Sequence, residues 1–274
     1  GDRAAVAIIG FAHGAVGLLT TGMIETMTDL GVLTGRVALV TGAAQRVGRE
    51  IALALARAGA SLIVHYNQSA EAAAQTASEI VALGRGCWPV RADLARPDEI
   101  NGFLDQLASR CPPVDILVNN ASVFLATPLA GDADARWDEI MAVNLRAPFM
   151  LARKLGLEMA DRGWGRIVNI GDCSTRRPYK HYTPYLVSKA ALLAATRCLA
   201  VELAPAVTVN AVSPGIVLPP SDGSADYEER MRRTTLLQRL GTPQDVARAV
   251  VFLVRDAPFT TGAEYMVDGG ASVR

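Results

Sequence analysis

The sequence lacks an excess of charge of either sign. Its 274 residues include 27 Lys and Arg against 27 Asp and Glu, so the formal net charge at pH 7 is zero. Proteins that attract nucleic acid or an anionic membrane over long distances carry a net positive charge. We therefore expect no nucleic-acid partner and a small molecule that is recognised locally.

Cysteine is scarce, and its spacing shows no metal-binding pattern. The chain has 4 cysteines and 3 histidines, with no C-x-x-C pair and no cysteine beside a histidine. Structural zinc sites use closely spaced ligands of these types. We expect no metal, a cytoplasmic location, and reduced thiols at Cys87, Cys111, Cys173 and Cys198.

Formal charge is also missing from residues 4–24, a stretch that meets the usual length test for a membrane span. Several glycines weaken a helix there, and His13, Thr20 and Thr21 dilute the hydrophobicity. A targeting signal, a membrane anchor and a buried interface helix all remain open. For residues 1–34 we favour an extension packed on the domain or on a partner subunit, and we expect no membrane span.

The remainder of the chain alternates between short apolar segments and segments with helical periodicity. Strands are expected at 36–40, 61–65, 87–92, 116–119, 166–170, 207–211 and 264–267. Helices are expected at 49–58, 70–83, 98–110, 137–162, 185–203 and 243–254. Such alternation predicts a parallel, doubly wound sheet. With 50% of its residues hydrophobic, the chain has enough apolar side chains for one large core. We predict one α/β domain over residues 35–274, with a seven-stranded Rossmann-type sheet and helices on both faces.

Polar or glycine-containing segments follow the expected strands where each strand ends. They are residues 41–48, Asp93, residues 119–122, Asp172 and residues 213–215. Ligands of parallel sheets bind at the carboxyl ends of the strands. The irregular segment 214–226 adjoins this edge, and we expect it to be either a lid or a mobile loop.

The segment 41–48 joins an expected strand to an expected helix through a turn that contains Gly42 and Gly48. Glycines let the backbone approach a phosphate closely, and the helix N-terminus offers free N–H groups. Turns also use glycine for conformational reasons alone, so both interpretations stay open. The strand–turn–helix context favours a phosphate site.

The second expected strand ends in His65-Tyr66-Asn67-Gln68-Ser69, without a carboxylate. An acidic residue at this position in dinucleotide-binding folds holds the adenosine ribose hydroxyls. Its absence, together with Arg46 in the neighbouring turn, favours NADPH over NADH. These residues could also be ordinary solvated loop residues.

A phenol, an ammonium and a carboxylate are spaced so that they can meet at one strand end. Tyr185 and Lys189 are four residues apart after Pro184, which places them on one helical face. Asp172 stands thirteen residues before Tyr185, after an expected strand. We predict a proton-delivery site. The alternative for Asp172 is a turn former beside Gly171.

With these motifs in view, the chain from about residue 34 resembles a short-chain dehydrogenase/reductase. The motifs are T-G-x-x-x-R-x-G at 41–48, N-N-A-S at 119–122, Asn144 in a helix, Y-x-x-x-K at 185–189 and P-G at 214–215. The resemblance implies that Tyr185 exchanges the proton. It also implies that Lys189 binds the nicotinamide ribose and lowers the phenol pKa, and that Asn144 holds a water in a proton relay.

Two departures from the common family pattern resemble the pteridine reductases. Arg46 replaces a turn glycine, and Asp172 replaces the catalytic serine. The residues at 65–66, 122–124 and 127–129 also resemble those of pteridine reductases. The subgroup implies NADPH-dependent reduction of a pterin or folate. Gln68 departs from it, because an arginine is expected at that position, and this leaves the strictness of NADPH selection open.

The resemblance implies cofactor-binding and substrate-binding roles for particular positions. The cofactor-binding residues are Gly42, Arg46, Val47, Gly48, His65, Tyr66, Asn67, Ser69, Asp93, Leu94, Asn120, Ala121, Ser122, Tyr185, Lys189, Pro214, Gly215 and Ile216. The substrate-binding residues are Arg46, Ser122, Phe124, Asp172 and Tyr185, with Phe124 stacked on the pterin ring. The alternative for Phe124 is core filler. We expect His181 to be a loop residue near the pocket mouth, and a catalytic role is the alternative there.

The sequence leaves three possible functions open. Pterin reduction is the main hypothesis, because a flat ring rich in nitrogen suits an aromatic face and a carboxylate. Reduction of an oxoacyl or xenobiotic ketone is the second, and a non-catalytic NADP-binding redox sensor is the third. The family resemblance also implies a homotetramer in which the C-terminal tail, with Arg274, approaches a neighbouring site.

Overall fold

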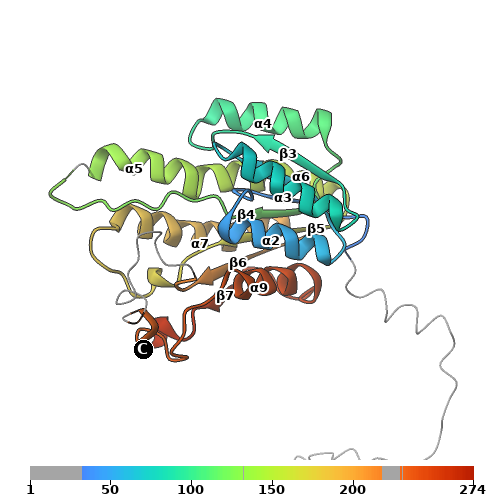
Figure 1. Cartoon of the computed structure of the whole chain (residues 1–274). Helices are drawn as coiled ribbons and strands as arrows, with labels where there is room; N and C mark the ends of the chain where they lie inside the picture. Colours follow the sequence, from blue (N-terminus) through green and yellow to red (C-terminus); the bar gives the residue numbers. More distant parts are fainter. Residues whose placement is uncertain (1–32, 132, 218–228, 230) are drawn as a thin grey trace, which may run out of the picture. The chain divides into compact units, whose positions relative to one another are not determined.

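The computed structural model describes residues 33–131, 133–217, 229 and 231–274 (Figure 1). The extension predicted at residues 1–34 lies outside the described residues except for its last two. Most of the irregular segment predicted at 214–226 lies outside them as well. The described chain belongs to one compact unit, Val32–Arg274.

Seven parallel strands form a single sheet, as the alternation of segments predicts. They are β1 (Val37–Val40), β2 (Ser61–Tyr66), β3 (Cys87–Arg91), β4 (Ile116–Asn119), β5 (Gly165–Ile170), β6 (Val207–Pro214) and β7 (Glu264–Val267). Their order is β3-β2-β1-β4-β5-β6-β7, and every neighbouring pair is parallel. The chain order reverses between β1 and β4, which opens a crevice for a ligand at the carboxyl ends of these strands.

Helices follow the strands close to the expected positions. They are α2 (Arg46–Arg57), α3 (Ala70–Ala82), α4 (Pro97–Arg110), α5 (Ala133–Met141), α6 (Ala147–Asp161), α7 (Thr183–Leu203) and α9 (Pro243–Arg255). The predicted single helix at 137–162 is divided by a π-helical turn at Ala142–Arg146. Pro148 has no N–H to donate to the carbonyl of Asn144. The Ala147 N–H donates to the carbonyl of Ala142, which is the hydrogen-bond spacing of a π-helix.

Helices cover both faces of the sheet (Figure 1). Helices α2, α3 and α9 pack on the face that carries Val40, Val64 and Val118. Helices α4, α6 and α7 pack on the opposite face, which carries Leu39 and Ile63. Successive strand residues point to opposite faces, so one strand supplies both cores. The fold prediction of a doubly wound, seven-stranded parallel sheet in one domain is confirmed.

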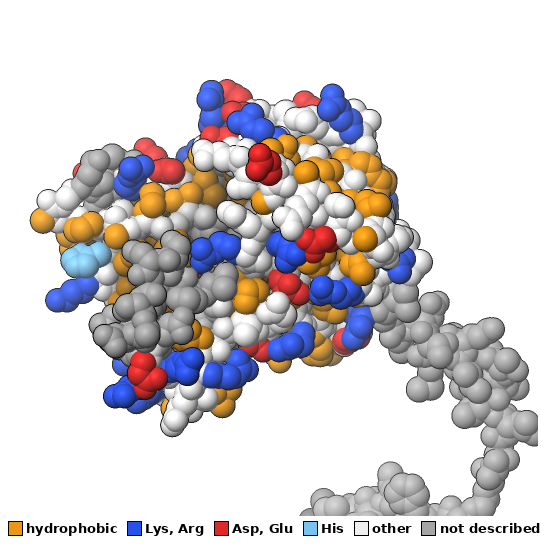
Figure 2. Space-filling view, in the orientation of Figure 1, with side chains coloured by type: hydrophobic (Ala, Val, Ile, Leu, Met, Phe, Trp, Pro, Cys, Tyr) orange, Lys and Arg blue, Asp and Glu red, His pale blue; other side chains and the backbone are white. Residues whose placement is uncertain are grey.

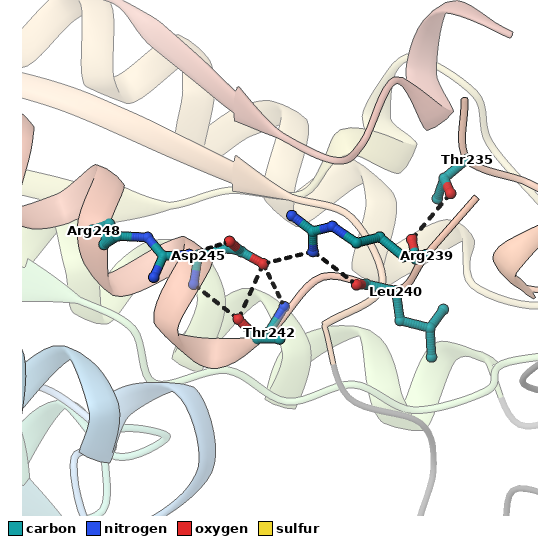
Figure 3. A network of polar contacts seen from close by, with 6 residues as sticks. All are labelled: Thr235, Arg239, Leu240, Thr242, Asp245 and Arg248. Carbon is teal, nitrogen blue, oxygen red and sulfur yellow. Dashed lines mark hydrogen bonds and ion pairs between the residues drawn. The ribbon is translucent and has the colours of Figure 1, made fainter. Parts of the chain in front are cut away.

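The start of α9 is fixed by a polar network around Asp245 (Figure 3). The Thr242 side chain accepts from the Asp245 N–H, and the Asp245 carboxylate accepts from the Thr242 N–H, which forms a capping box. Arg239 donates to the same carboxylate at 3.0 Å, and Arg248 pairs with it as well. The Arg239 hydrogen bond is the main reason that the Asp245 pKa falls to about 2. The start of the helix expected at 243–254 is confirmed.

Basic and acidic side chains are interspersed across the face shown in Figure 2. None of the helices described within residues 33–274 is both long and apolar enough to cross a membrane.

Candidate active site

The turn between β1 and α2 depends on two glycines. Gly42 has a φ of 64°, in the left-handed region that other residues rarely adopt. A Cβ atom at Gly48 would overlap the Gly42 carbonyl oxygen and lie 2.5 Å from Asn120 Nδ2. Asn120 Nδ2 donates to the carbonyls of Thr41, at 2.9 Å, and Gly42, at 3.2 Å. The turn is therefore closely packed and held from β4, with no room for a side chain at Gly48.

The side chain of His65 contacts this turn through a hydrogen bond to Gly42. Its side chain was expected to contact the cofactor, but it is 2% exposed and bonded to protein on both ring nitrogens. Nδ1 accepts from the Gly42 N–H at 3.0 Å, and Nε2 lies 3.1 Å from the Ala92 carbonyl oxygen. Burial lowers the His65 pKa to about 4, which keeps the ring neutral. The structure thus gives the His65 side chain contacts to the turn and to the end of β3.

A cavity of about 500 Å³ lies in front of the turn, at the carboxyl ends of β1, β2 and β4. Most of the predicted cofactor-binding residues line it: Gly42, Arg46, Val47, Gly48, Tyr66, Asn67, Ser69, Asn120, Ala121 and Ser122. Gln68 also lines it. Arg46 is exposed there, with a φ of 55°. The open cavity, the glycine turn and this cation fit the phosphates and adenosine ribose of a dinucleotide.

Five other predicted cofactor residues, Asp93, Leu94, Pro214, Gly215 and Ile216, lie after β3 or at the end of β6, and they are not part of the lining of this cavity. Asp93 Oδ1 accepts from the Ala95 N–H at 3.0 Å, and Leu94 is buried. Gly215 allows close passage of the chain, since a Cβ there would lie 2.9 Å from Asp268 Cα. Pro214 ends β6, and Ile216 follows with its carbonyl bonded to the Gly241 N–H. These residues follow the carboxyl ends of their strands, on the same side of the sheet as the cavity.

The predicted meeting of Tyr185 and Asp172 is present in the structure. The Tyr185 hydroxyl donates to Asp172 Oδ2 at 2.6 Å. Asp172 Oδ1 accepts from the Ser174 N–H at 2.7 Å, at the start of a short 3₁₀ turn, Cys173–Thr175. The carboxylate therefore caps a turn and accepts the phenol hydrogen bond at the same time, and its catalytic role stays a prediction.

Lys189 lies one helical turn after Tyr185 on α7, with its side chain buried. Its Nζ donates to the Ile170 carbonyl at 2.8 Å and lies 5.8 Å from the centroid of the Tyr185 ring. Burial lowers the Lys189 pKa to about 8, although Asp172 opposes this effect. Burial and the Asp172 charge raise the Tyr185 pKa well above its usual value. This direction is opposite to the lowered phenol pKa that the resemblance implies, because burial disfavours the phenolate and the carboxylate of Asp172 lies beside it.

Asn144 sits in the π-helical turn and is completely buried. Its Oδ1 accepts from the Val123 N–H at 2.8 Å and from Ser122 Oγ at 3.2 Å. Its Nδ2 donates to the Val123 carbonyl at 3.0 Å and to Ser188 Oγ at 3.1 Å. These contacts use the full capacity of an amide side chain. The side chain thus holds the loop at 122–123 in place, and the water relay expected at Asn144 stays a prediction.

Ser188 is not among the site residues predicted from the sequence, and Thr41 is predicted only as part of the turn motif at 41–48. Ser188 donates to the Tyr185 carbonyl and accepts from Asn144, so it joins α7 to the π-helical turn. Thr41 Oγ1 accepts from the N–H groups of Asn120 and Ala121. The position of Ser188, three residues after Tyr185 on the same helical face, is the signal that could have identified it.

Phe124 lies beside Tyr185 and is 53% exposed, which excludes the alternative role of core filler. The two rings meet edge to face, with centroids 4.8 Å apart. His181 is exposed in the segment before α7, and its carbonyl accepts from the Thr127 N–H. Phe124, Asp172 and Tyr185 therefore lie together, whereas Arg46 lines the cavity at the β1–α2 turn.

Together the sheet and its glycine turn define a nucleotide-binding oxidoreductase fold, with an ionisable Tyr-Lys-Asp cluster at the carboxyl ends of the central strands. The chain belongs to the short-chain dehydrogenase/reductase family. The sequence model of the family described as Enoyl-(Acyl carrier protein) reductase matches residues 42–272.

Relatives with known structures or curated names are similar over nearly the whole domain. A 3-oxoacyl-[acyl-carrier-protein] reductase from Synechocystis sp. is 34% identical over 87% of this chain and 97% of its own length. An angucycline C-6 ketoreductase with bound NADP is 33% identical, with a TM-score of 0.81 over 89% of this chain and 98% of that one. A gluconate 5-dehydrogenase from Burkholderia cenocepacia, in complex with NADP and tartrate, is 28% identical, with a TM-score of 0.83 over 90% and 99%.

Proposed function

We propose that this protein is an NADPH-dependent reductase of a carbonyl substrate, with Tyr185 as the proton donor. The observation that carries the proposal is the cluster of the buried Tyr185 and Lys189 with the partly exposed Asp172 at the carboxyl ends of the strands, where the dinucleotide cavity also opens. Similarity to a 3-oxoacyl reductase and to a C-6 ketoreductase supports a carbonyl substrate over the pterin expected from the sequence.

NADPH, when bound, supplies the hydride, and the residues of this chain hold it and deliver the proton. The turn at 42–48 would hold the phosphates against the N-terminus of α2. Arg46 and the segment 66–69 at the end of β2 would surround the adenosine ribose and its 2′-phosphate. The end of β2 has no carboxylate that would repel this phosphate, so binding of NADPH is favoured over binding of NADH.

In this proposal Tyr185 donates the proton to the substrate, and the neighbouring Lys189 and Asp172 assist it. A phenol with a raised pKa holds its proton firmly, and its charged form gains stability only from a nearby cation. Lys189 is the cation on the same helical face, and it would also bind the nicotinamide ribose. Asp172 accepts the phenol hydrogen bond and keeps the hydroxyl oriented until substrate arrives.

Pterin reduction is the second candidate, and Asp172 is the observation that favours it. An ionised carboxylate offers only acceptors, whereas the serine usual in the family can donate to a carbonyl oxygen. A substrate that presents N–H groups, or a ring nitrogen that must gain a proton, suits a carboxylate better. Arg46 and the exposed Phe124 ring agree with this candidate.

One assay separates the candidates. NADPH oxidation would be measured with ethyl acetoacetate, 9,10-phenanthrenequinone, dihydrobiopterin and dihydrofolate, and repeated with NADH. Turnover of the ketones without turnover of the pterins supports carbonyl reduction, and the reverse supports the second candidate. An absence of NADPH oxidation with every substrate, by a folded protein that binds NADPH, would contradict both.

We further propose that the protein assembles with copies of itself, as a homotetramer. The edge strands of the sheet are β3 and β7. Pro89 in β3 has no N–H and disfavours pairing of this edge with a further strand. The β7 edge carries the half-exposed Tyr265 beside Phe252 of α9, with ring centroids 5.8 Å apart. Arg274 lies next to Arg177 of its own chain, close to the Asp172 turn. Sedimentation at several concentrations tests the assembly, and a monomer throughout would contradict it.

A further inference from the structure

Tyr182 is an aromatic residue beside the site that the proposed chemistry does not use. Its ring stacks on that of Phe124, with centroids 4.6 Å apart and planes inclined by 17°. Tyr179 meets Tyr182 edge to face at 5.1 Å. The Phe124 ring in turn stands nearly perpendicular to that of Tyr185, at 84°. Two rings therefore fix the plane of Phe124 directly next to the proton donor.

Hydrogen bonds also tie together the two segments that carry these rings. The Thr127 N–H and Oγ1 donate to the His181 carbonyl at 2.5 Å and 3.3 Å. Thr127 is buried, and His181 has a φ of 70°, a conformation that non-glycine residues adopt only when their surroundings hold them there. The loop with Phe124 and the segment with Tyr182 are thus held in one relative position.

Phe124 remains half exposed although Tyr182 covers it on one side and Tyr185 meets it at another. The partly exposed Phe124 ring lies next to Tyr185, whose hydroxyl donates to Asp172. A flat aromatic molecule can contact such a ring over its whole face, whereas an open-chain molecule cannot. Stacked pairs gain from this contact beyond the area that they bury.

We infer that Tyr182 is a specificity-determining residue: its stack holds Phe124 as a platform that selects planar, ring-containing substrates over open-chain ones. The inference rests on the proposed function, since it names the substrate class of that same site. Tyr182 acts through Phe124, so it is a positioning residue. A flat ring placed on Phe124 would lie beside Tyr185 and Asp172, within their reach.

The test compares Tyr182→Leu, which removes the stack, with the control Tyr182→Phe, which keeps it. The planar probes are 9,10-phenanthrenequinone and dihydrobiopterin, and ethyl acetoacetate is the open-chain probe. KM and kcat are measured with NADPH, and dissociation constants are measured on the NADP⁺ complex by protein fluorescence. Tyr182→Leu should raise KM and the dissociation constant of a planar probe about fivefold, with less than about a twofold change for ethyl acetoacetate. Tyr182→Phe should change neither.

A second variant, Phe124→Leu, should produce the same selective loss. The double variant should then be no worse than either single one, because both remove the same platform. Equal losses for planar and open-chain probes would reduce Tyr182 to a structural role and overturn the inference. Tighter binding of planar probes by Tyr182→Leu would also overturn it, since the ring would then occupy the substrate's place. Because binding is measured without turnover, a failure of this inference is distinguishable from a failure of the proposed reduction.

Discussion

The Tyr185 hydroxyl donates its hydrogen bond to Asp172 Oδ2, 2.6 Å away, while Asp172 Oδ1 is held by the Ser174 N–H. The orientation of the phenol proton is therefore set by a carboxylate that is itself fixed in a turn. A carboxylate cannot donate to a substrate oxygen while it is ionised, so the identity of residue 172 affects which substrates the site accepts.

Replacing Asp172 with serine should change the substrate preference. Serine can both accept from Tyr185 and donate to a carbonyl oxygen, so Asp172→Ser should keep or raise kcat/KM for ethyl acetoacetate. For dihydrobiopterin, kcat/KM should fall about tenfold, because one charge-assisted hydrogen bond is lost. Steady-state kinetics with both substrates check this, with Asp268→Ser as a carboxylate control. An equal fall for both substrates would contradict the prediction.

The rate should depend on the charge of Lys189. Burial lowers the Lys189 pKa to about 8, so its amine loses the proton as the pH rises through that value. We expect kcat/KM to decline above about pH 8, because the neutral amine no longer stabilises the phenolate. Arginine stays charged at all these pH values, so Lys189→Arg should show lower rates without that decline. A decline that is identical in wild type and variant would assign it to another group.

Stability should fall in acid because His65 is buried as a neutral ring. Its pKa is lowered from 6.5 to about 4, chiefly by burial, so the unfolded chain binds the proton more readily than the folded one. The contribution is fully present above pH 6.5 and decreases as the pH falls toward 4. Over that interval wild type should lose about 3 kcal/mol more than His65→Leu. Urea unfolding at several pH values measures this, with the exposed His181→Gln as control. Parallel pH profiles for wild type and His65→Leu would contradict it.

Cofactor binding should depend on Gly48. A Cβ there would overlap the Gly42 carbonyl oxygen, so Gly48→Ala should force the turn apart. We expect the NADPH dissociation constant to rise by about tenfold or more, in line with the usual cost of overpacking. Fluorescence titration with NADPH provides the measurement. Gly102→Ala is the matched control, because a Cβ at Gly102 in α4 meets no atom within 4 Å. Unchanged binding by Gly48→Ala would contradict the role of the turn.

The sheet could be predicted from the sequence because hydrophobic periodicity and glycine turns are local signals. All seven strands lie where those signals placed them, within a few residues at their ends. The helical periodicity of 137–162 does not predict the π-helical turn that interrupts this helix. Pro148 is the residue in the sequence that could have indicated it. Helix α2 likewise begins at Arg46, inside the segment 41–48 that the sequence predicts as a turn.

The site was predicted less completely, because parts of it depend on contacts between distant segments. The spacing of Asp172, Tyr185 and Lys189 placed them correctly at one strand end. Burial of His65 could not be inferred from its position at the end of a strand. The stack of Tyr182 on Phe124 requires two loops to meet, and no local pattern predicts that. The resemblance to pteridine reductases implies a pterin substrate, whereas two similar proteins are named as a 3-oxoacyl-[acyl-carrier-protein] reductase and an angucycline C-6 ketoreductase.

The most direct test of the account is NADPH oxidation by wild type and Tyr185→Phe, measured together with NADPH binding. Phenylalanine keeps the ring but removes the proton, so turnover of the accepted substrate should fall about 10²- to 10⁴-fold. NADPH binding should change by less than about twofold, because the proposed phosphate and adenosine contacts come from other residues. Turnover by Tyr185→Phe at the wild-type rate would show that the proton comes from elsewhere and would contradict the account.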